Sequence, residues 1–201
     1  VEVEVFARPS RAVRVESKIV VGLERISAGF EAAGSGLVAV VDLEDNSALG
    51  VGLGELQNCG RVVPVPRNPT RVMVACLGFS FPYGDEAQVR ESAGIAVLDV
   101  GGNGVAVERI WRVADDADSA IAVNSIVALD ERFVLGVANG DFDTQVDRLV
   151  LTNLTTGDQD VVHASSGSFV VGVSAYELTG RMLYVPDAAS KEVVAYMEGE
   201  K

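Results

Sequence analysis

The sequence contains few of the residues from which metal and catalytic sites are usually built. It has one histidine, His163, and two cysteines, Cys59 and Cys76, among 201 residues. The cysteines lack the C-x-x-C spacing of a zinc site, and a single histidine cannot supply a histidine-rich site. Ser165 and Ser166 follow the histidine, but the Gly-x-Ser-x-Gly turn of a hydrolase nucleophile is missing. Neither a zinc site nor a serine hydrolase of that kind is indicated.

Long apolar runs and helix-favouring stretches are also scarce. No apolar run approaches the roughly 20 residues that a membrane-spanning helix needs. Gly101-Gly102-Asn103-Gly104 lacks a following helical pattern, so it predicts a turn and not a phosphate-binding loop. Acidic residues outnumber basic ones by 29 to 16, for a formal net charge of −13. Such a charge attracts cations and basic partners and repels nucleic acid.

Short runs of β-branched and aromatic residues, separated by turn residues, fill most of the chain. The region 132–162 is the clearest, with strands expected at 132–137, 149–153 and 159–162. Four times a basic residue opens an apolar run, at Lys18, Arg71, Arg132 and Arg181, which are 53, 61 and 49 residues apart. A period near 50 residues made of short strands is typical of propeller blades. A β-sandwich with regular turns is the alternative, although the steady repeat phase favours the propeller.

The fold class expected is therefore all-β, a β-propeller of about four four-stranded antiparallel blades in a single domain spanning residues 1–201. The blades are expected near residues 11–56, 59–112, 119–163 and 169–197. Residues 1–6 alternate between apolar and acidic, as an outer strand would. They are predicted to pair with Lys191–Met197 and to close the ring through the last blade. The alternative is a larger propeller, completed by further sequence or by a partner chain.

The two cysteines flank a predicted hairpin. If the hairpin is centred between Arg67 and Asn68, Cys59 lies opposite Cys76, within the range that a disulfide bridges. A loop of this size would stabilise the fold by about 3 kcal/mol on the chain-entropy model. A disulfide predicts an extracellular, periplasmic or other cell-envelope location, whereas the alternative is a pair of buried, reduced thiols.

The blade layout resembles that of secreted β-propeller repeat proteins with YVTN-like blades. The resemblance is carried by a strand, a polar residue and a glycine-containing turn, as in Leu149-Val150-Leu151-Thr152-Asn153-Leu154-Thr155-Thr156-Gly157. The string Tyr-Val-Thr-Asn itself is absent. The resemblance implies the fold and brings no active-site motif with it.

In a propeller, the loops between second and third strands share one face with the loops that lead to the next blade. Nine acidic residues fall in such loops: Asp85, Glu86, Asp115, Asp116, Asp118, Asp141, Asp143, Asp147 and Asp187. Aromatic residues lie in the longest of these loops and suggest a contact patch, unless they fold back onto the blade. The residues predicted to bind a partner here are Phe79, Phe81, Tyr83, Asp85, Asp115, Asp116 and Asp118.

The alternating carboxylates Asp141, Asp143 and Asp147 are predicted as a calcium site, because Ca²⁺ prefers several oxygen ligands. The EF-hand pattern fails here, and a solvated acidic loop is the alternative. No other cofactor is suggested by the sequence.

Two functions fit these patterns. The first is a non-enzymatic binding or scaffold module of a secreted or cell-envelope protein, whose acidic loop-rich face binds a protein or a small cationic ligand. The alternative is a Ca²⁺-dependent hydrolase of the lactonase type with its site in the central funnel, which would need carboxylates from several blades on the axis.

Overall fold

Four antiparallel sheets follow one another along the chain in the computed structural model, which describes residues 4–102, 104–141, 143–172, 175–177 and 181–197. The first three sheets have four strands each and the fourth has three described strands. Blade 1 consists of β2 (Pro9–Val15), β3 (Lys18–Leu23), β5 (Ser35–Asp42) and β6 (Ala48–Gln57), and blade 2 of β7 (Arg61–Pro64), β8 (Arg71–Leu77), β9 (Ala93–Asp99) and β10 (Ala106–Arg112). Blade 3 consists of β11 (Asn124–Ala128), β12 (Phe133–Ala138), β13 (Arg148–Asn153) and β14 (Gln159–Ala164). The described strands of blade 4 are β15 (Ala175–Glu177), β16 (Met182–Asp187) and β17 (Glu192–Met197).

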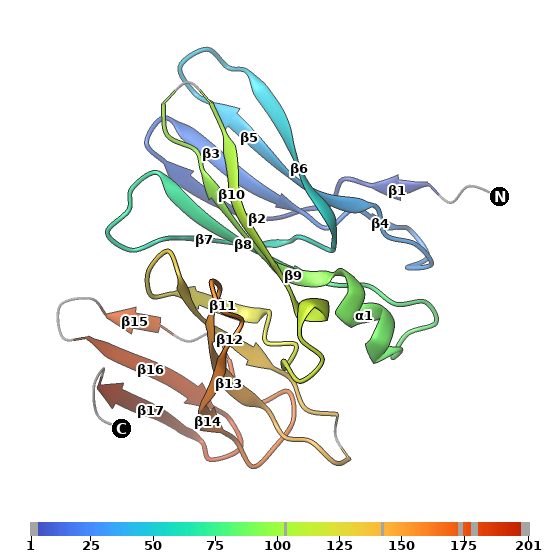
Figure 1. Ribbon diagram of the computed structural model, residues 1–201, viewed down its shortest axis with the longest axis vertical. Helices are drawn as coiled ribbons and strands as arrows, with labels where there is room; N and C mark the ends of the chain where they lie inside the picture. Colours follow the sequence, from blue (N-terminus) through green and yellow to red (C-terminus); the bar gives the residue numbers. More distant parts are fainter. Residues whose placement is uncertain (1–3, 103, 142, 173–174, 178–180, 198–201) are drawn as a thin grey trace.

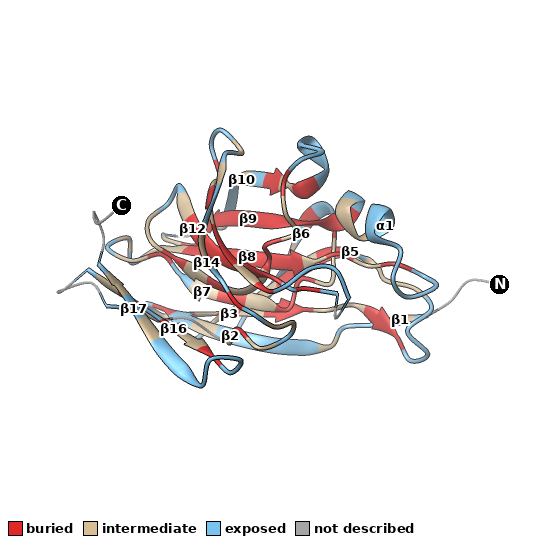
Figure 2. Ribbon diagram, turned by 90° about the horizontal axis from the view of Figure 1, so that it is seen from below, coloured by how far each residue is buried: buried red, intermediate tan, exposed pale blue. Residues whose placement is uncertain are grey.

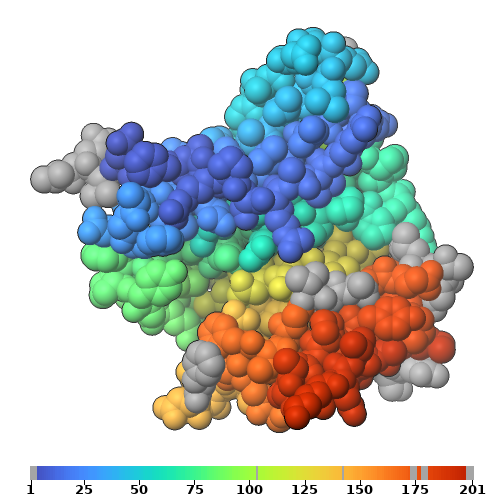
Figure 3. All heavy atoms as spheres, turned by 180° about the vertical axis from the view of Figure 1, so that it is seen from behind, coloured from blue at the N-terminus to red at the C-terminus, as the bar shows by residue number. Residues whose placement is uncertain are grey.

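Within each blade the strands are hydrogen-bonded to their chain neighbours, and the blades stack in chain order (Figure 1). The space-filling view shows the same order as successive bands of colour (Figure 3). The first strands of three blades, β2, β7 and β11, contact one another in series and form the inner side of the stack. This is the blade architecture of a β-propeller, so the predicted fold class is confirmed.

The hydrophobic core lies between the blades. One apolar cluster joins blades 1 and 2, a second joins blades 2 and 3, and a third joins blades 3 and 4. Strand β9 is buried almost throughout because blades cover both of its faces, whereas β2 and β17 lie at the ends of the stack and are largely exposed (Figure 2). Each β-branched run therefore stabilises the contact of its blade with the next one.

The disulfide predicted from the sequence is present between Cys59 and Cys76. Both cysteines are fully buried in the cluster between blades 1 and 2. The hairpin register differs by one residue from the predicted one, because Arg61 lies opposite Ala75. Cys59 also forms a β-bridge with Leu23, the last residue of β3. The segment before β7 is therefore tied to blade 1 by the bridge and to β8 of blade 2 by the disulfide.

The N-terminal strand pairs differently from the prediction. In β1 (Val5–Phe6), Val5 lies opposite Ser27 and Phe6 opposite Ile26 of β4 (Ile26–Ser27), within the β3–β5 connection of blade 1. Phe6 is 45% exposed rather than packed inward. In the described part of the chain, residues 5 and 6 therefore pair within blade 1. Residues 1–3 lie outside that part, and closure of the ring through the last blade stays a prediction. The local partner competes successfully because β4 is only about 20 residues away, which keeps the loop-closure entropy small.

A helix, α1 (Glu86–Ser92), interrupts the β8–β9 connection that the sequence predicts as a loop. Asp85 is its N-cap and accepts a hydrogen bond from the backbone N–H of Gln88, whose side chain donates back to Asp85. The Asp85 carboxylate thus accepts both hydrogen bonds from Gln88 and caps the first turn of the helix. Across the described residues, no helix is both long and apolar enough to cross a membrane.

Candidate binding cleft

A cleft of about 630 Å³ opens where blades 1 and 2 meet at the loop-rich end of the molecule. Its walls come from the end of β6, the segment after β8, helix α1, the end of β10 and the short 3₁₀ helix η1 (Val113–Asp115). The lining residues are Glu55, Gln57, Phe79, Phe81, Gln88, Glu91, Ser92, Arg112, Ala114 and Asp115. Three of the predicted binding residues, Phe79, Phe81 and Asp115, are thus brought together.

Three carboxylates and one guanidinium line the cleft. Arg112 forms ion pairs with Glu55, at 2.6 Å between Nη1 and Oε2, and with Asp115, at 3.1 Å between Nη2 and Oδ1. The third carboxylate, Glu91, is exposed and makes no hydrogen bond or ion pair with any described residue. The cleft therefore has an excess of negative charge, with one carboxylate open to a cation.

The aromatic segment beside the cleft is held in place by α1. The backbone N–H of Phe79 donates to Oγ of Ser92, and the backbone N–H of Phe81 donates to Oε1 of Gln88. Gly78, with φ of +75°, lets the chain pass against the helix, since a Cβ there would lie 2.3 Å from the carbonyl oxygen of Val89. Phe81 is 53% exposed despite these contacts. The segment is thus a fixed apolar edge and not a cap over the blade.

The other predicted binding residues lie near the cleft without lining it. Tyr83 is 84% exposed, at the tip of the same segment. Asp85 is occupied as the helix cap. Asp116 accepts hydrogen bonds from the backbone N–H of Asp118 and from Oγ of Ser119, so it shapes its own turn. Asp118 is exposed.

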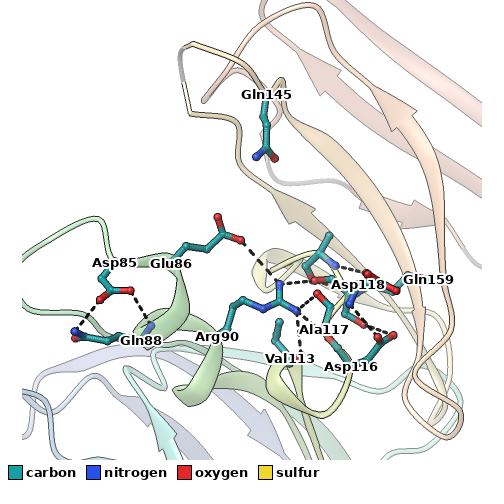
Figure 4. A network of polar contacts seen from close by, with 12 residues as sticks. Asp85, Glu86, Gln88, Arg90, Val113, Asp116, Ala117, Asp118, Gln145 and Gln159 are labelled. Atoms are coloured by element: carbon teal, nitrogen blue, oxygen red, sulfur yellow. Dashed lines mark hydrogen bonds and ion pairs between the residues drawn. The ribbon is translucent and has the colours of Figure 1, made fainter.

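Arg90, on the far side of α1 from the capping residues, holds the connection between blades 2 and 3. Its guanidinium donates to the carbonyl oxygens of Ser119, Asp116 and Ala117 at 2.6–2.9 Å and to that of Val113 at 3.5 Å. Figure 4 shows the guanidinium directed at this ring of carbonyl groups. The wall of the cleft that carries Asp115 is therefore fixed relative to α1. The sequence shows Arg90 only as an isolated cation among acids.

The predicted calcium ligands have separate local roles. Asp147 is fully buried, and its two oxygens accept hydrogen bonds from four backbone N–H groups, those of Gly140, Phe169, Val170 and Val171, at 2.6–2.8 Å. Asp141 is exposed and accepts from the backbone N–H groups of the turn that follows it. Its pKa is lowered, first by the hydroxyl of Thr144 and then by those N–H groups.

Asp143 is exposed in the same turn. Among the residues that the structure describes, no group of three or more His, Cys, Asp or Glu side chains could hold a metal ion. The structure does not bring the predicted trio together as a ligand set.

His163 and Ser165 meet a third polar residue, Asp187, between blades 3 and 4. His163 Nε2 lies 2.9 Å from Oδ2 of Asp187, and Oγ of Ser165 donates to Oδ1 at 2.9 Å. The other ring nitrogen of His163 lies 2.7 Å from the hydroxyl of Tyr196. The serine therefore bonds to the carboxylate and not to the imidazole, which is not the arrangement of a catalytic triad. Asp187 is 3% exposed and joins the two blades.

No protein-family model matches the sequence, and no curated protein sequence matches it. Several solved structures resemble the fold, among them the following three. Acylaminoacyl peptidase from Pyrococcus horikoshii has a TM-score of 0.53 at 13% identity, over 97% of this chain and 32% of that chain. TolB from Acinetobacter baumannii has a TM-score of 0.47 at 10% sequence identity, over 95% of this chain and 43% of that chain. The β-propeller domain of the trilobed protease from Pyrococcus furiosus has a TM-score of 0.44 at 10% sequence identity, over 94% of this chain and 57% of that chain.

The likeness to the peptidase agrees with the blade topology and with the resemblance to propeller proteins inferred from the repeats. At 13% identity, the similarity to the peptidase shows a shared fold and does not extend to its activity. The chain spans less than two thirds of the length of each of the three proteins.

Proposed function

We propose that this β-propeller is a non-enzymatic binding module whose cleft between blades 1 and 2 binds a basic segment of a partner polypeptide. The observation that carries the proposal is the pairing of an unpartnered carboxylate, Glu91, with an exposed aromatic side chain, Phe81, in one cleft of about 630 Å³. A lysine or arginine side chain needs both a carboxylate for its charged end and an apolar surface for its methylene groups.

The rest of the cleft suits a charged chain better than a neutral one. Arg112 pairs with Glu55 and Asp115 but carries only one positive charge. A neutral ligand would leave the excess negative charge, including that of Glu91, without compensation. The formal net charge of −13 would raise the rate at which a basic partner arrives. Because α1 and Arg90 fix the walls, little conformational entropy is lost on binding.

The test is a calorimetric titration of the protein with a lysine-rich peptide and with the same peptide acetylated on its lysines. The unmodified peptide should bind with an affinity that falls as salt is added, because exposed charge pairs are screened. Glu91→Gln and Phe81→Ala should each weaken binding by about two- to fivefold, the effect of one exposed charge or cation–π contact.

Glu44→Gln is the matched control. Glu44 is an exposed acid in the turn that precedes β6, at the opposite end of that strand from the cleft, and its removal changes the net charge equally. The affinity of E44Q for the unmodified peptide should equal that of the wild type. Equal weakening by E44Q and E91Q would mean that only net charge attracts the peptide, and the cleft would then not be the site. Equal binding of the acetylated peptide would also contradict the proposal.

We place the protein outside the cytoplasm, either secreted or in a cell envelope. The support is the buried Cys59–Cys76 disulfide, since such bonds persist mainly in oxidising compartments. Mass spectrometry of protein from its native compartment, alkylated before any reduction, checks this proposal. Two alkylated cysteines per chain would contradict it.

A further inference from the structure

Two arginines from neighbouring blades share a small cavity on the inner side of the stack. The cavity has a volume of about 110 Å³ and is lined by Arg11 on β2, Arg61 and Val63 on β7, and Ser125 and Ile126 on β11. The backbone N–H of Arg11 donates to the carbonyl oxygen of Gly60 at 3.2 Å. This contact places the two arginines at adjacent backbone positions, although they are 50 residues apart in the sequence.

Neither guanidinium has a partner. Arg11 and Arg61 make no side-chain hydrogen bond, ion pair or ring contact with any described residue. Elsewhere in the described chain the arginines are commonly occupied: Arg71 forms a two-bond pair with Glu108, and Arg112 bonds Glu55 and Asp115. Both unpaired cations line one cavity in a protein with 29 acidic and 16 basic residues, and repulsion between them is unfavourable.

The third polar side chain in the cavity is Ser125. It lies at a β-bulge of β11, where the register shifts between Asn124 and Val127, and its φ is +47°. Bulges redirect side chains, and left-handed backbone at a residue other than glycine is strained by about 1–3 kcal/mol. The hydroxyl of Ser125 has no partner among the described residues. A strained bulge therefore adds an unused donor to the two unused guanidinium groups.

We infer that this cavity is an anion-binding site for one small oxyanion, a carboxylate or phosphate group. Guanidinium groups present N–H donors in a planar fork that matches such groups. A volume of about 110 Å³ corresponds to about three or four water molecules at their share of liquid volume, which suits a single group of this kind. The apolar walls of Val63 and Ile126 strengthen the attraction by lowering the local dielectric constant.

The site is independent of the acidic cleft, and it is opposite in sign. The hydrolase considered from the sequence would need carboxylates on the propeller axis, but arginines line this cavity. Glu24, which lies against the backbone of Gly60, is the acid near this seam. It forms no ion pair with either arginine, so it leaves both guanidinium groups available to a ligand.

The test is calorimetric titration of the full chain with inorganic phosphate and, separately, with succinate. The wild type should bind at least one of the two in a saturable manner, and the tighter of the two identifies the group as phosphate or carboxylate. Arg61→Gln and Arg11→Gln should each weaken binding about tenfold, the factor expected when one charge-assisted hydrogen bond is lost. Ser125→Ala should weaken it less, because a neutral donor is lost.

Arg14→Gln is the matched control, since Arg14 lies on the same strand as Arg11 and is exposed. Its Nε donates to the carbonyl oxygen of Glu16 and not into the cavity. R14Q should bind as the wild type does. Circular dichroism and thermal melting check that each variant is folded. If R61Q does not fold, R61K replaces it, and it should also bind more weakly because an ammonium group lacks the planar fork. Absence of saturable binding to both anions, or equal weakening by R14Q, would overturn the inference.

Discussion

The two connections that join blades 2 to 3 and 3 to 4 are held by opposite charges. Arg90, in the β8–β9 connection, donates to carbonyl oxygens in residues 113–119. Asp147, in the corresponding β12–β13 connection, accepts from backbone N–H groups at residues 169–171. In both cases a side chain from the connection between the second and third strands of one blade binds the segment that links this blade to the next. Either a cation or an anion can hold such a connection, because the backbone offers both N–H donors and carbonyl acceptors.

The two charges differ in how completely they are withdrawn from water. The side chain of Arg90 is 19% exposed and also lies 3.9 Å from Glu86, whereas Asp147 is fully buried and accepts hydrogen bonds from backbone N–H groups in the described part of the chain. Removing Asp147 would leave four N–H groups without an acceptor in the interior. Removing Arg90 would leave carbonyl groups of which two belong to the exposed residues Asp116 and Ala117, where water can replace the guanidinium. Replacing Asp147 should therefore lower the free energy of unfolding more than replacing Arg90 does.

The largest effect is expected for Asp147→Ala. Loss of the acceptor for four backbone N–H groups should lower the free energy of unfolding by about 3–5 kcal/mol. Urea denaturation followed by circular dichroism measures it. Asp147→Asn keeps the size of the side chain but exchanges one acceptor oxygen for a donor, so it should recover only part of the loss. A loss below about 1 kcal/mol for D147A would mean that water replaces the carboxylate easily.

Arg90→Ala should have a smaller effect, about 2 kcal/mol, because two of its carbonyl partners, those of Asp116 and Ala117, belong to exposed residues that water can reach. Arg90→Lys should recover about half of that, since one ammonium group cannot reach all the carbonyl oxygens that the planar guanidinium reaches. The same urea experiment compares the two connections directly. If R90A proved more destabilising than D147A, burial would not be what separates them.

Acid should affect the two connections differently. Burial acts to raise the pKa of Asp147, but the four backbone hydrogen bonds outweigh it, so its pKa lies below the ordinary value of 3.8. A carboxyl group whose folded pKa is depressed stabilises the protein above its unfolded pKa, and that contribution is lost as the pH falls through the folded value. Guanidinium groups do not lose their proton in this pH range. In melts between pH 7 and pH 2, the difference between wild type and D147A should shrink below about pH 4, and that between wild type and R90A should stay constant.

The smallest effect concerns Glu86, the acid nearest Arg90. Glu86→Gln should change the free energy of unfolding by less than about 0.5 kcal/mol, because an exposed pair within one helix contributes little. The residue faces solvent, with a side chain 67% exposed. A change as large as that of R90A would mean that the carboxylate, and not the carbonyl groups, is the main partner of Arg90.

Much of the fold follows from local patterns in the sequence. The strands expected at 132–137, 149–153 and 159–162 are found at Phe133–Ala138, Arg148–Asn153 and Gln159–Ala164. The four basic openings each mark the second strand of a blade, because a turn and a buried strand follow each other there. The disulfide was predictable because the hairpin brings Cys59, just before β7, close to Cys76 on β8, although the register differs by one residue from the predicted one.

The side-chain contacts between blades could not be predicted in this way. Asp147 follows two other aspartates in a polar loop, a pattern shared by exposed turns and calcium sites, and its burial depends on residues more than 20 positions later. Helix α1 had a detectable signal, the Asp85-x-x-Gln88 pair, but its seven residues are too few to show a helical period. Of the cleft, the sequence indicated Phe79, Phe81 and Asp115, whereas Glu55, Glu91 and Arg112 lie together only once blades 1 and 2 pack.

The carboxylate of Asp147 also affects how the molecule opens. The N–H groups of Phe169, Val170 and Val171 precede β15, and the carbonyl oxygen of Val170 accepts from Ala188 after β16. The segment is thus bound on one side to a loop of blade 3 and on the other to blade 4. Amides outside regular strands ordinarily exchange their hydrogen with solvent quickly, but these three should exchange only when both blades loosen together. In hydrogen–deuterium exchange, blades 3 and 4 would then behave as one cooperative unit, in which the three described strands of blade 4 share the stability of their neighbour.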